Sequence, residues 1–167
     1  MTLTFVEAGP DDFTAIAALW FRAQAARRSA SFATLSDSRA LVALRAAEAG
    51  SWFILASEDE RTVGFAHGVP GRKNDGLGKP IRGLLQLGMI AVEPSEWGHG
   101  IGKRLMERCF EIALERDYHK LQLWTHADNV RAQRLCEGLG FTRTGRIKLD
   151  PRGETIVQYG RSTTGDR

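Results

Sequence analysis

The chain has few cysteines and no long apolar run. Two cysteines among 167 residues are too few for a disulfide framework, and the N-terminus shows no cationic segment followed by an apolar stretch. We therefore expect two reduced thiols and a cytoplasmic location. No stretch approaches the roughly 20 apolar residues of a membrane-spanning helix, so we expect no membrane partner.

The chain also lacks a strong excess of charge of either sign. Its 23 lysines and arginines stand against 20 acidic residues, which gives a formal net charge of +3. A small positive charge suits an anionic cofactor but is too weak and too scattered to predict binding to nucleic acid. With 43% hydrophobic residues the chain can bury its own core, so we predict a single domain over residues 1–167.

The most informative feature that is present is a glycine-rich junction. Gly98, Gly100 and Gly102 alternate with other residues, directly after an apolar run and directly before an amphipathic stretch. Glycine lets the backbone approach a ligand closely, and the first N–H groups of a helix have no intrahelical partner. The helix dipole and Lys103 add positive charge. The junction predicts a phosphate-binding turn.

The spacing of these glycines excludes two familiar phosphate-binding motifs. A P-loop requires a glycine where Trp97 stands and a metal-binding hydroxyl where Arg104 stands. The dinucleotide fingerprint requires Gly-x-Gly-x-x-Gly and an acidic residue about 20 positions later. Here the third glycine comes one position early, and no acidic residue lies around Gln122. A magnesium nucleotide and NAD are both disfavoured.

Strand and helix signals alternate along the whole chain. The run at 84–92 is nearly continuous in apolar residues and predicts a central strand that is covered on both faces. Further strands are predicted at 3–7, 52–57, 62–69, 121–125, 141–147 and 155–159, and helices at 10–26, 36–50, 98–116 and 129–139. This alternation predicts an α/β fold with a mixed sheet flanked by helices.

Two blocks of the sequence resemble the GNAT superfamily of N-acetyltransferases. The turn from Trp97 to Gly102 is similar to the signature Gln/Arg-x-x-Gly-x-Gly/Ala that follows a strand ending in Val-x-Pro, although a tryptophan replaces the first residue. Residues 129–141 look like Asn-x-x-Ala-x-x-Leu-Tyr-x-x-x-Gly-Phe, with Cys136 in place of the tyrosine. The resemblance thus defines a glycine-turn cofactor motif at 89–105 and a second cofactor or acid motif at 129–141.

The resemblance implies acetyl-coenzyme A (acetyl-CoA) as the cosubstrate and no metal ion. It also implies that two parallel strands, ending near Val92 and Thr125, splay apart, so that their unpaired backbone groups can bond the pantetheine amides. The cofactor-binding residues that it implies are Met89, Ile90, Ala91, Val92, Trp97, Gly98, His99, Gly100, Ile101, Gly102, Lys103, Asn129 and Arg131.

The implied reaction moves an acetyl group from acetyl-CoA to a primary amine of a small molecule or peptide by direct attack on the thioester. Cys136 is a candidate acid for the leaving thiolate, because the two thiols have similar reference pKa values; it could equally be a small buried residue. Gln86 and Gly88 occupy the positions where some members carry a carboxylate base. His67 is the main candidate base, against the alternative of a polar residue at a strand end, and His126, Asp128 and Glu93 are weaker candidates.

A second hypothesis is that the chain binds acyl-CoA as a sensor or scaffold without turnover. The missing tyrosine and the missing carboxylate base favour it. In the family the acceptor contacts variable segments, here residues 20–40 and 70–82, and neither carries a readable signature. A homodimer through the C-terminal strands is implied only by analogy with the family.

Overall fold

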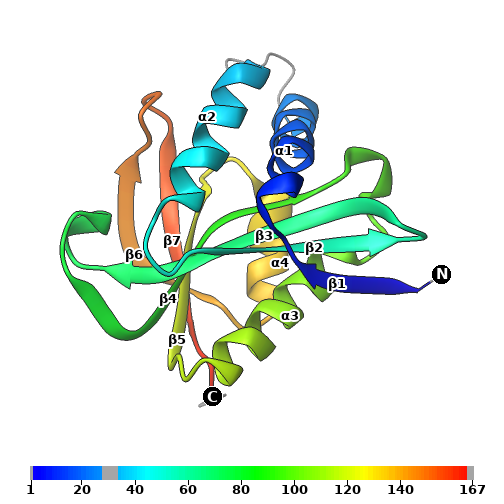
Figure 1. Ribbon diagram of the computed structural model, residues 1–167. Helices are drawn as coiled ribbons and strands as arrows, with labels where there is room; N and C mark the ends of the chain where they lie inside the picture. Colours follow the sequence, from blue (N-terminus) through cyan, green and yellow to red (C-terminus); the bar gives the residue numbers. More distant parts are fainter. Residues whose placement is uncertain (1, 28–33, 165–167) are drawn as a thin grey trace. The chain divides into compact units, whose positions relative to one another are not determined.

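The computed structural model describes residues 2–27 and 34–164 (Figure 1). The part of the predicted acceptor segment at 28–33 lies outside these residues. The elements, in chain order, are β1 (Leu3–Glu7), η1 (Pro10–Asp12), α1 (Phe13–Arg27), α2 (Leu35–Ala46), β2 (Trp52–Glu58), β3 (Arg61–Arg72), η2 (Asn74–Gly76), β4 (Pro80–Val92), η3 (Pro94–Glu96), α3 (Ile101–Glu115), β5 (Lys120–His126), α4 (Val130–Gly138), β6 (Thr142–Leu149) and β7 (Thr155–Ser162).

The strands form a mixed sheet in the order β1-β2-β3-β4-β5-β7-β6, which confirms the predicted α/β class. Strands β4 and β5 run parallel, with Leu84–Leu87 paired to residues 120–123, whereas β2 pairs antiparallel with β1 and β3, and β7 with β5 and β6. By its internal contacts the chain divides into a first unit, residues 1–69 and 89–109, and a second unit, residues 70–88 and 110–167. The splay of β4 from β5 and the single domain stay predictions.

In the first unit, α1 and α2 lie side by side and share a core with the strands (Figure 1). Trp20 of α1 meets Phe65 of β3 edge to face, with ring centroids 6.2 Å apart. The neighbouring Gly64 points the other way, because side chains alternate across a strand, and a Cβ there would lie 2.9 Å from Leu105 of α3. The two helices therefore cover one face of β3, and the first half of α3 covers the other.

The start of α2 shows how local side chains fix a helix end. Thr34 caps the helix: its hydroxyl accepts from the N–H of Asp37 at 3.0 Å, and the carboxylate of Asp37 accepts from the N–H of Thr34 at 2.9 Å. This reciprocal pair satisfies donors that would otherwise lack partners. The helix therefore begins at Leu35, one residue before the predicted start near Ser36.

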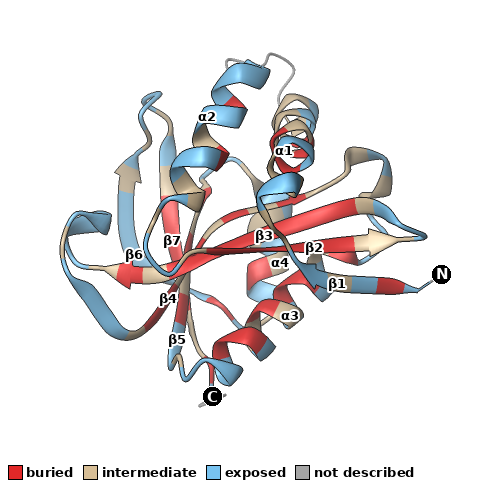
Figure 2. Cartoon of the chain, in the orientation of Figure 1, coloured by how far each residue is buried: buried red, intermediate tan, exposed pale blue. Residues whose placement is uncertain are grey.

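In the second unit, β5 and β7 form the buried part and β6 an exposed edge (Figure 2). Leu121 and Leu123 of β5 are buried, while Trp124 and His126, which follow them in the strand, are half-buried on the opposite face. Tyr159 of β7 is fully buried. The predicted closing hairpin is confirmed, with longer strands than expected.

Two expectations about composition can be compared with the structure. Cys109 and Cys136 are both free, as the low cysteine content predicts, and both are buried. Over residues 2–27 and 34–164, no helix is long and apolar enough to span a membrane.

Candidate functional site

The glycine turn lies in the first unit, between the end of β4 and the start of α3. Gly98 and Gly100 have φ angles of +86° and +80°, in the left-handed region that favours glycine. A Cβ added at either position would meet no atom within 4 Å. Gly102 already belongs to α3. The turn therefore has a backbone that side chains would strain and open space beside it for a ligand.

The first turn of α3 presents backbone donors at this open space. Its earliest hydrogen bond runs from the N–H of Arg104 to the carbonyl of Gly100, at 3.2 Å. The preceding N–H groups, those of residues 101–103, have no acceptor within the helix. Lys103 and Arg104 are exposed and add charge beside the positive end of the helix dipole. This arrangement suits a phosphate ligand.

Trp97 serves the turn itself. Its indole Nε1–H donates to the carbonyl of Val92 at 2.9 Å, and its backbone N–H donates to the carbonyl of Pro94 at 3.2 Å. Both groups are therefore engaged inside the protein, and the tryptophan closes the loop that leads into the turn. The sequence predicts Trp97 among the cofactor contacts. In the structure its indole and backbone N–H groups bond to the loop instead.

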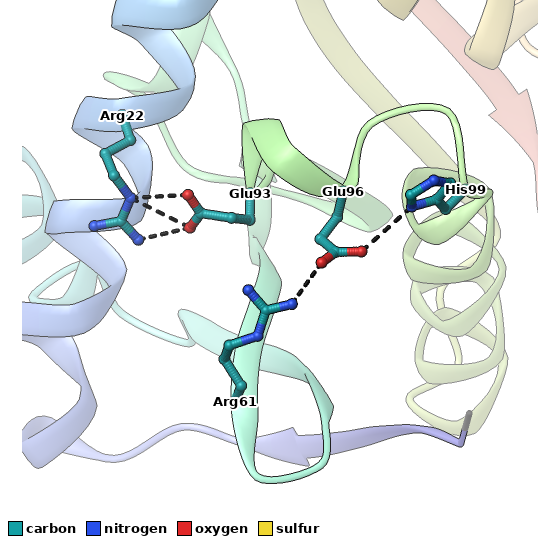
Figure 3. A network of polar contacts seen from close by, with 5 residues as sticks. All are labelled: Arg22, Arg61, Glu93, Glu96 and His99. Atoms are coloured by element: carbon teal, nitrogen blue, oxygen red, sulfur yellow. Dashed lines mark hydrogen bonds and ion pairs between the residues drawn. The ribbon is translucent and has the colours of Figure 1, made fainter.

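Two groups of ion pairs brace the turn from neighbouring elements (Figure 3). Arg22 of α1 forms a two-point ion pair with Glu93, which follows β4. Its Nε donates to Oε1 at 3.0 Å, and its Nη2 donates to Oε2 at 2.6 Å. The hydrogen bond to Glu93 raises the pKa of the Arg22 guanidinium. Such a two-point contact orients both groups better than a single bond does.

The second group joins β3, η3 and the turn through Glu96. Arg61 Nη2 donates to Glu96 Oε1 at 2.5 Å, and His99 Nδ1 lies 3.3 Å from Oε2 of the same carboxylate (Figure 3). These two hydrogen bonds, that of Arg61 first, lower the pKa of Glu96. His99 itself lies in the turn and keeps 64% of its side chain exposed. Sequence reasoning missed both groups, because their members on α1, β3 and the turn carry no common spacing.

The candidate base His67 lies in the middle of β3 in this structure. The prediction of a strand end is wrong, because β3 continues to Arg72. The side chain is fully buried, stands opposite Phe53 in the register and packs on that ring with centroids 4.8 Å apart. Burial lowers the pKa of His67 to about 4, against a smaller opposing effect of Glu48. The imidazole is neutral but a weak base, and solvent does not reach it.

In the second unit, the block at 129–141 contains α4, and Asn129 caps it. The side-chain oxygen of Asn129 accepts from the N–H of Ala132 at 3.2 Å. Gln133 donates to the carbonyls of His126 and Ala127, at 3.1 and 2.8 Å, and so ties the helix to the end of β5. Arg131 is exposed on the first turn. The block is thus a well-capped helix with two exposed basic side chains, Arg131 and Arg134.

The candidate acid Cys136 is buried within α4, with 3% of its surface exposed. Burial, and then the charge of Glu137, raise the pKa of the thiol to about 11. Proton transfer to a thiolate of reference pKa about 8.5 would then be uphill by about 3 kcal/mol rather than matched. This environment favours the interpretation of Cys136 as a packing residue.

Comparison with known proteins agrees with the fold. The model of the Acetyltransferase (GNAT) family matches residues 13–141. Human N-acetyltransferase 8B is 30% identical over 130 residues, which cover 77% of this chain and 56% of that protein. The chain spans between about a third and just over half of the length of the first curated relatives it matches.

Two solved structures share the fold over nearly the whole chain. The ribosomal-protein-S18-alanine N-acetyltransferase of Escherichia coli gives a TM-score of 0.74 at 18% identity and covers 97% of this chain and 94% of that one. A Salmonella typhimurium protein solved with its cofactor acetyl-CoA gives a TM-score of 0.73 at 20% identity and covers 98% of this chain and 95% of that one. With the family model matching more than half of the residues, the chain belongs to the acetyltransferase (GNAT) family.

Proposed function

We propose that this chain transfers an acetyl group from acetyl-CoA to a primary amine of a small molecule or peptide. The observation that carries the proposal is the open turn at 98–103, with two left-handed glycines, clear space beside them and helix N–H groups without intrahelical acceptors. Coenzyme A supplies the phosphate oxygens that such a turn binds. The acetyl-CoA in the Salmonella structure supports the choice of cofactor.

The backbone from Gly98 to Lys103 is assigned to the pyrophosphate. Ile101, Gly102 and Lys103 offer N–H groups, and the Lys103 side chain adds a full charge. The backbone of Met89–Val92 is assigned to the pantetheine arm, and Asn129 and Arg131 keep their expected cofactor roles. Trp97 contributes by closing the loop that leads into the turn.

The proposed chemistry is direct attack. The amine nitrogen forms a bond to the thioester carbon, the oxyanion collapses, and the carbon–sulfur bond breaks to release the coenzyme thiolate. An N–H near Ile90 or Ala91 is assigned to the oxyanion. Since His67 and Cys136 are buried, water takes the proton of the amine and protonates the thiolate, and orientation alone supplies ~7–11 kcal/mol in favourable cases.

The same burial favours a second candidate function. With His67 shifted to a pKa of about 4 and Cys136 to about 11, neither expected proton-transfer group is suited to its task. A chain that holds acyl-CoA in the open turn without turnover would be a sensor or scaffold. We rank this function second, because the family's named relatives are acetyltransferases.

One preparation of protein can separate the two functions. Thiol release from acetyl-CoA is followed across a panel of amines that includes amino acids, polyamines, aminoglycosides and peptides with free N-termini, while calorimetry measures cofactor binding. Saturable release stimulated by one amine class establishes the enzyme. Tight binding without release on any amine favours the sensor, or an acceptor outside the panel. Absence of binding contradicts the assignment of the turn itself.

We also propose a cytoplasmic location, which the two free buried thiols support because a reducing compartment keeps cysteines unpaired. A reducing-agent titration with mass spectrometry of the purified protein checks that both thiols stay free. A small-molecule or peptide amine, rather than nucleic acid, is the proposed acceptor, in line with the low net charge of +3.

A further inference from the structure

Three side chains that can ligate a metal ion converge in the second unit. None of them is among the residues assigned to the cofactor. His126 is the last residue of β5, and Asp150 and Glu154 stand at the two ends of the turn between β6 and β7. The sheet brings them together, because His126 lies opposite Ile156 of β7, and the N–H of Ala127 donates to the carbonyl of Thr155 at 2.9 Å.

The ligand atoms of this cluster face one another. Nε2 of His126 lies 2.8 Å from Oδ2 of Asp150 and 3.6 Å from Oε2 of Glu154, and all three atoms lie within 4.8 Å of one another. Between 15% and 28% of each side chain is exposed. The cluster is therefore mostly shielded from solvent and combines one nitrogen with two carboxylate oxygens.

These separations distinguish between possible cations. Zn²⁺ bonds of 2.0–2.2 Å in tetrahedral geometry set ligand atoms roughly 3.3–3.6 Å apart, so the side chains need to move by less than about 1 Å. An ammonium group that donates three hydrogen bonds of about 2.8 Å would require acceptors about 4.6 Å apart. The contact of His126 with Asp150 is much shorter than that. The geometry fits a metal ion better than a substrate amine.

The turn that carries the carboxylates is held in place for this arrangement. Oδ1 of Asp150 accepts from the backbone N–H groups of Arg152 and Glu154, both at 2.9 Å, and this leaves Oδ2 aimed at His126. The turn closes further through the N–H of Asp150, which donates to the carbonyl of Glu154 at 2.8 Å. Outer hydrogen bonds of this kind orient metal ligands and reduce the cost of ordering them.

We propose that His126, Asp150 and Glu154 bind a divalent transition-metal ion, with Zn²⁺ as the representative and water completing the coordination. An imidazole among the ligands selects Zn²⁺ over Mg²⁺ and Ca²⁺, which take oxygen ligands. Two carboxylates and a neutral imidazole balance the charge of a dication. The ion joins the end of β5 to the β6–β7 turn and stabilises the second unit, which departs from the expectation of no metal.

The direct test is calorimetry on untagged protein that has been stripped with a chelator. Titration with ZnCl₂ at about pH 7.5 is expected to show one ion per chain, and the unfolding midpoint is expected to rise by several degrees at saturation, because the ion binds the folded state. MgCl₂ in excess is expected not to compete. Because ligands must be deprotonated, the affinity for Zn²⁺ is expected to fall on acidification.

Two variants localise the ion, and a third serves as the matched control. Glu154→Gln and His126→Gln are each expected to lower the affinity for Zn²⁺ at least tenfold. His99→Gln removes the histidine of another carboxylate pair, that of Glu96, which has one carboxylate and a largely exposed ring. It is expected to bind Zn²⁺ like the wild type. Circular dichroism in chelator verifies that each variant is folded.

The outcomes separate the site from adventitious binding. Absence of a one-to-one complex overturns the proposal, and so does wild-type affinity in both Glu154→Gln and His126→Gln. Loss of binding in His99→Gln alone would place the ion at the glycine turn and also overturn it. If the variants unfold, the visible spectrum of the Co²⁺-loaded wild type decides: ligand-field bands without a thiolate charge-transfer band support the nitrogen and oxygen ligands, and a thiolate band contradicts them.

Discussion

The glycine turn and the two proton-transfer candidates have opposite surroundings. A Cβ at Gly98 or Gly100 would meet no atom within 4 Å, so the turn is open. His67 and Cys136 are 0% and 3% exposed. Burial favours the neutral form of each group, so it lowers the pKa of the imidazole and raises the pKa of the thiol. The backbone of the turn is open to a ligand, whereas the side chains at the expected catalytic positions pack in the core.

The largest expected effect comes from filling the open turn. Gly100→Trp places a bulky side chain where the pyrophosphate is assigned and strains a backbone with φ of +80°. Loss of two charge-assisted hydrogen bonds, each worth about 1.5–3 kcal/mol, predicts acetyl-CoA affinity about 1,000-fold lower, which corresponds to about 4 kcal/mol. Calorimetry with acetyl-CoA measures the affinity of the variant and of the wild type.

Gly153→Trp is the matched control for this substitution. Gly153 has a φ of +81° and equally open surroundings, but it lies in the β6–β7 turn. The control carries the same backbone strain, and we expect its affinity for acetyl-CoA to stay within about twofold of the wild type. Equal affinities in the two tryptophan variants would show that the cofactor does not use the turn at 98–103.

The burial of His67 predicts an acid-sensitive fold. Because the pKa of His67 is about 4 in the folded state and near 6.5 when unfolded, the unfolded chain binds more protons between these values. The contribution is complete above about pH 6.5 and is lost as the pH falls toward about 4. The free energy of unfolding should fall by about 3 kcal/mol over this range, as measured by urea denaturation at each pH.

His67→Gln removes the titrating group and should flatten this dependence. The variant tests the burial on which the comparison rests, because an exposed His67 would titrate alike in both states. A slope between pH 6.5 and 4 that is unchanged in the variant would mean that other groups cause it, and His67 would again be open to a catalytic role.

Local features of the fold were predictable from the sequence. The strand at 84–92, the glycine turn and the helix after it depend on neighbours within about ten residues, since apolar runs, left-handed glycines and helix periodicity are short-range properties. The alternation of strands and helices likewise predicted the mixed α/β sheet. Trp97 departs from the family signature, and its role became visible only with its bond to Val92.

Properties that depend on distant partners were not predictable. Arg22 and Glu93 are 71 residues apart, and His126 and Asp150 are 24 apart, so no spacing rule links them. His67 reads as a polar strand residue, and its burial follows from the packing of Phe53 and of the helices on that face. Side-chain chemistry depends on burial and partners, which periodicity indicates only coarsely.

A smaller effect is expected from the second candidate. Cys136→Ala should leave turnover within about threefold of the wild type, since a buried thiol with a pKa of about 11 is a poor proton donor at neutral pH. The free energy of unfolding should fall by about 1 kcal/mol, because removal of the sulfur leaves a small cavity. The other buried cysteine, Cys109, provides Cys109→Ala as a control with similar cost in stability. A large loss of turnover confined to Cys136→Ala would restore the thiol as the acid.

The smallest effect tests whether the ion pairs beside the turn contribute to binding. Arg61→Met removes a positive charge and leaves Glu96 without its shortest hydrogen bond, so the potential at the turn becomes more negative. Because the Arg61 side chain is 58% exposed, solvent screens the effect, and we expect acetyl-CoA affinity only about threefold lower at 0.1 M salt. Calorimetry at 0.1 M and 1 M salt measures the difference.

At about 1 M salt the Debye length shortens to about 3 Å, and the difference between Arg61→Met and the wild type should nearly vanish. Arg45→Met is the control, since Arg45 of α2 forms a comparable pair with Glu48 at 2.9 Å and is not part of the turn's ion pairs. A loss that persists at high salt would mean that Arg61 and Glu96 shape the turn through geometry, so that the open backbone site also depends on side chains.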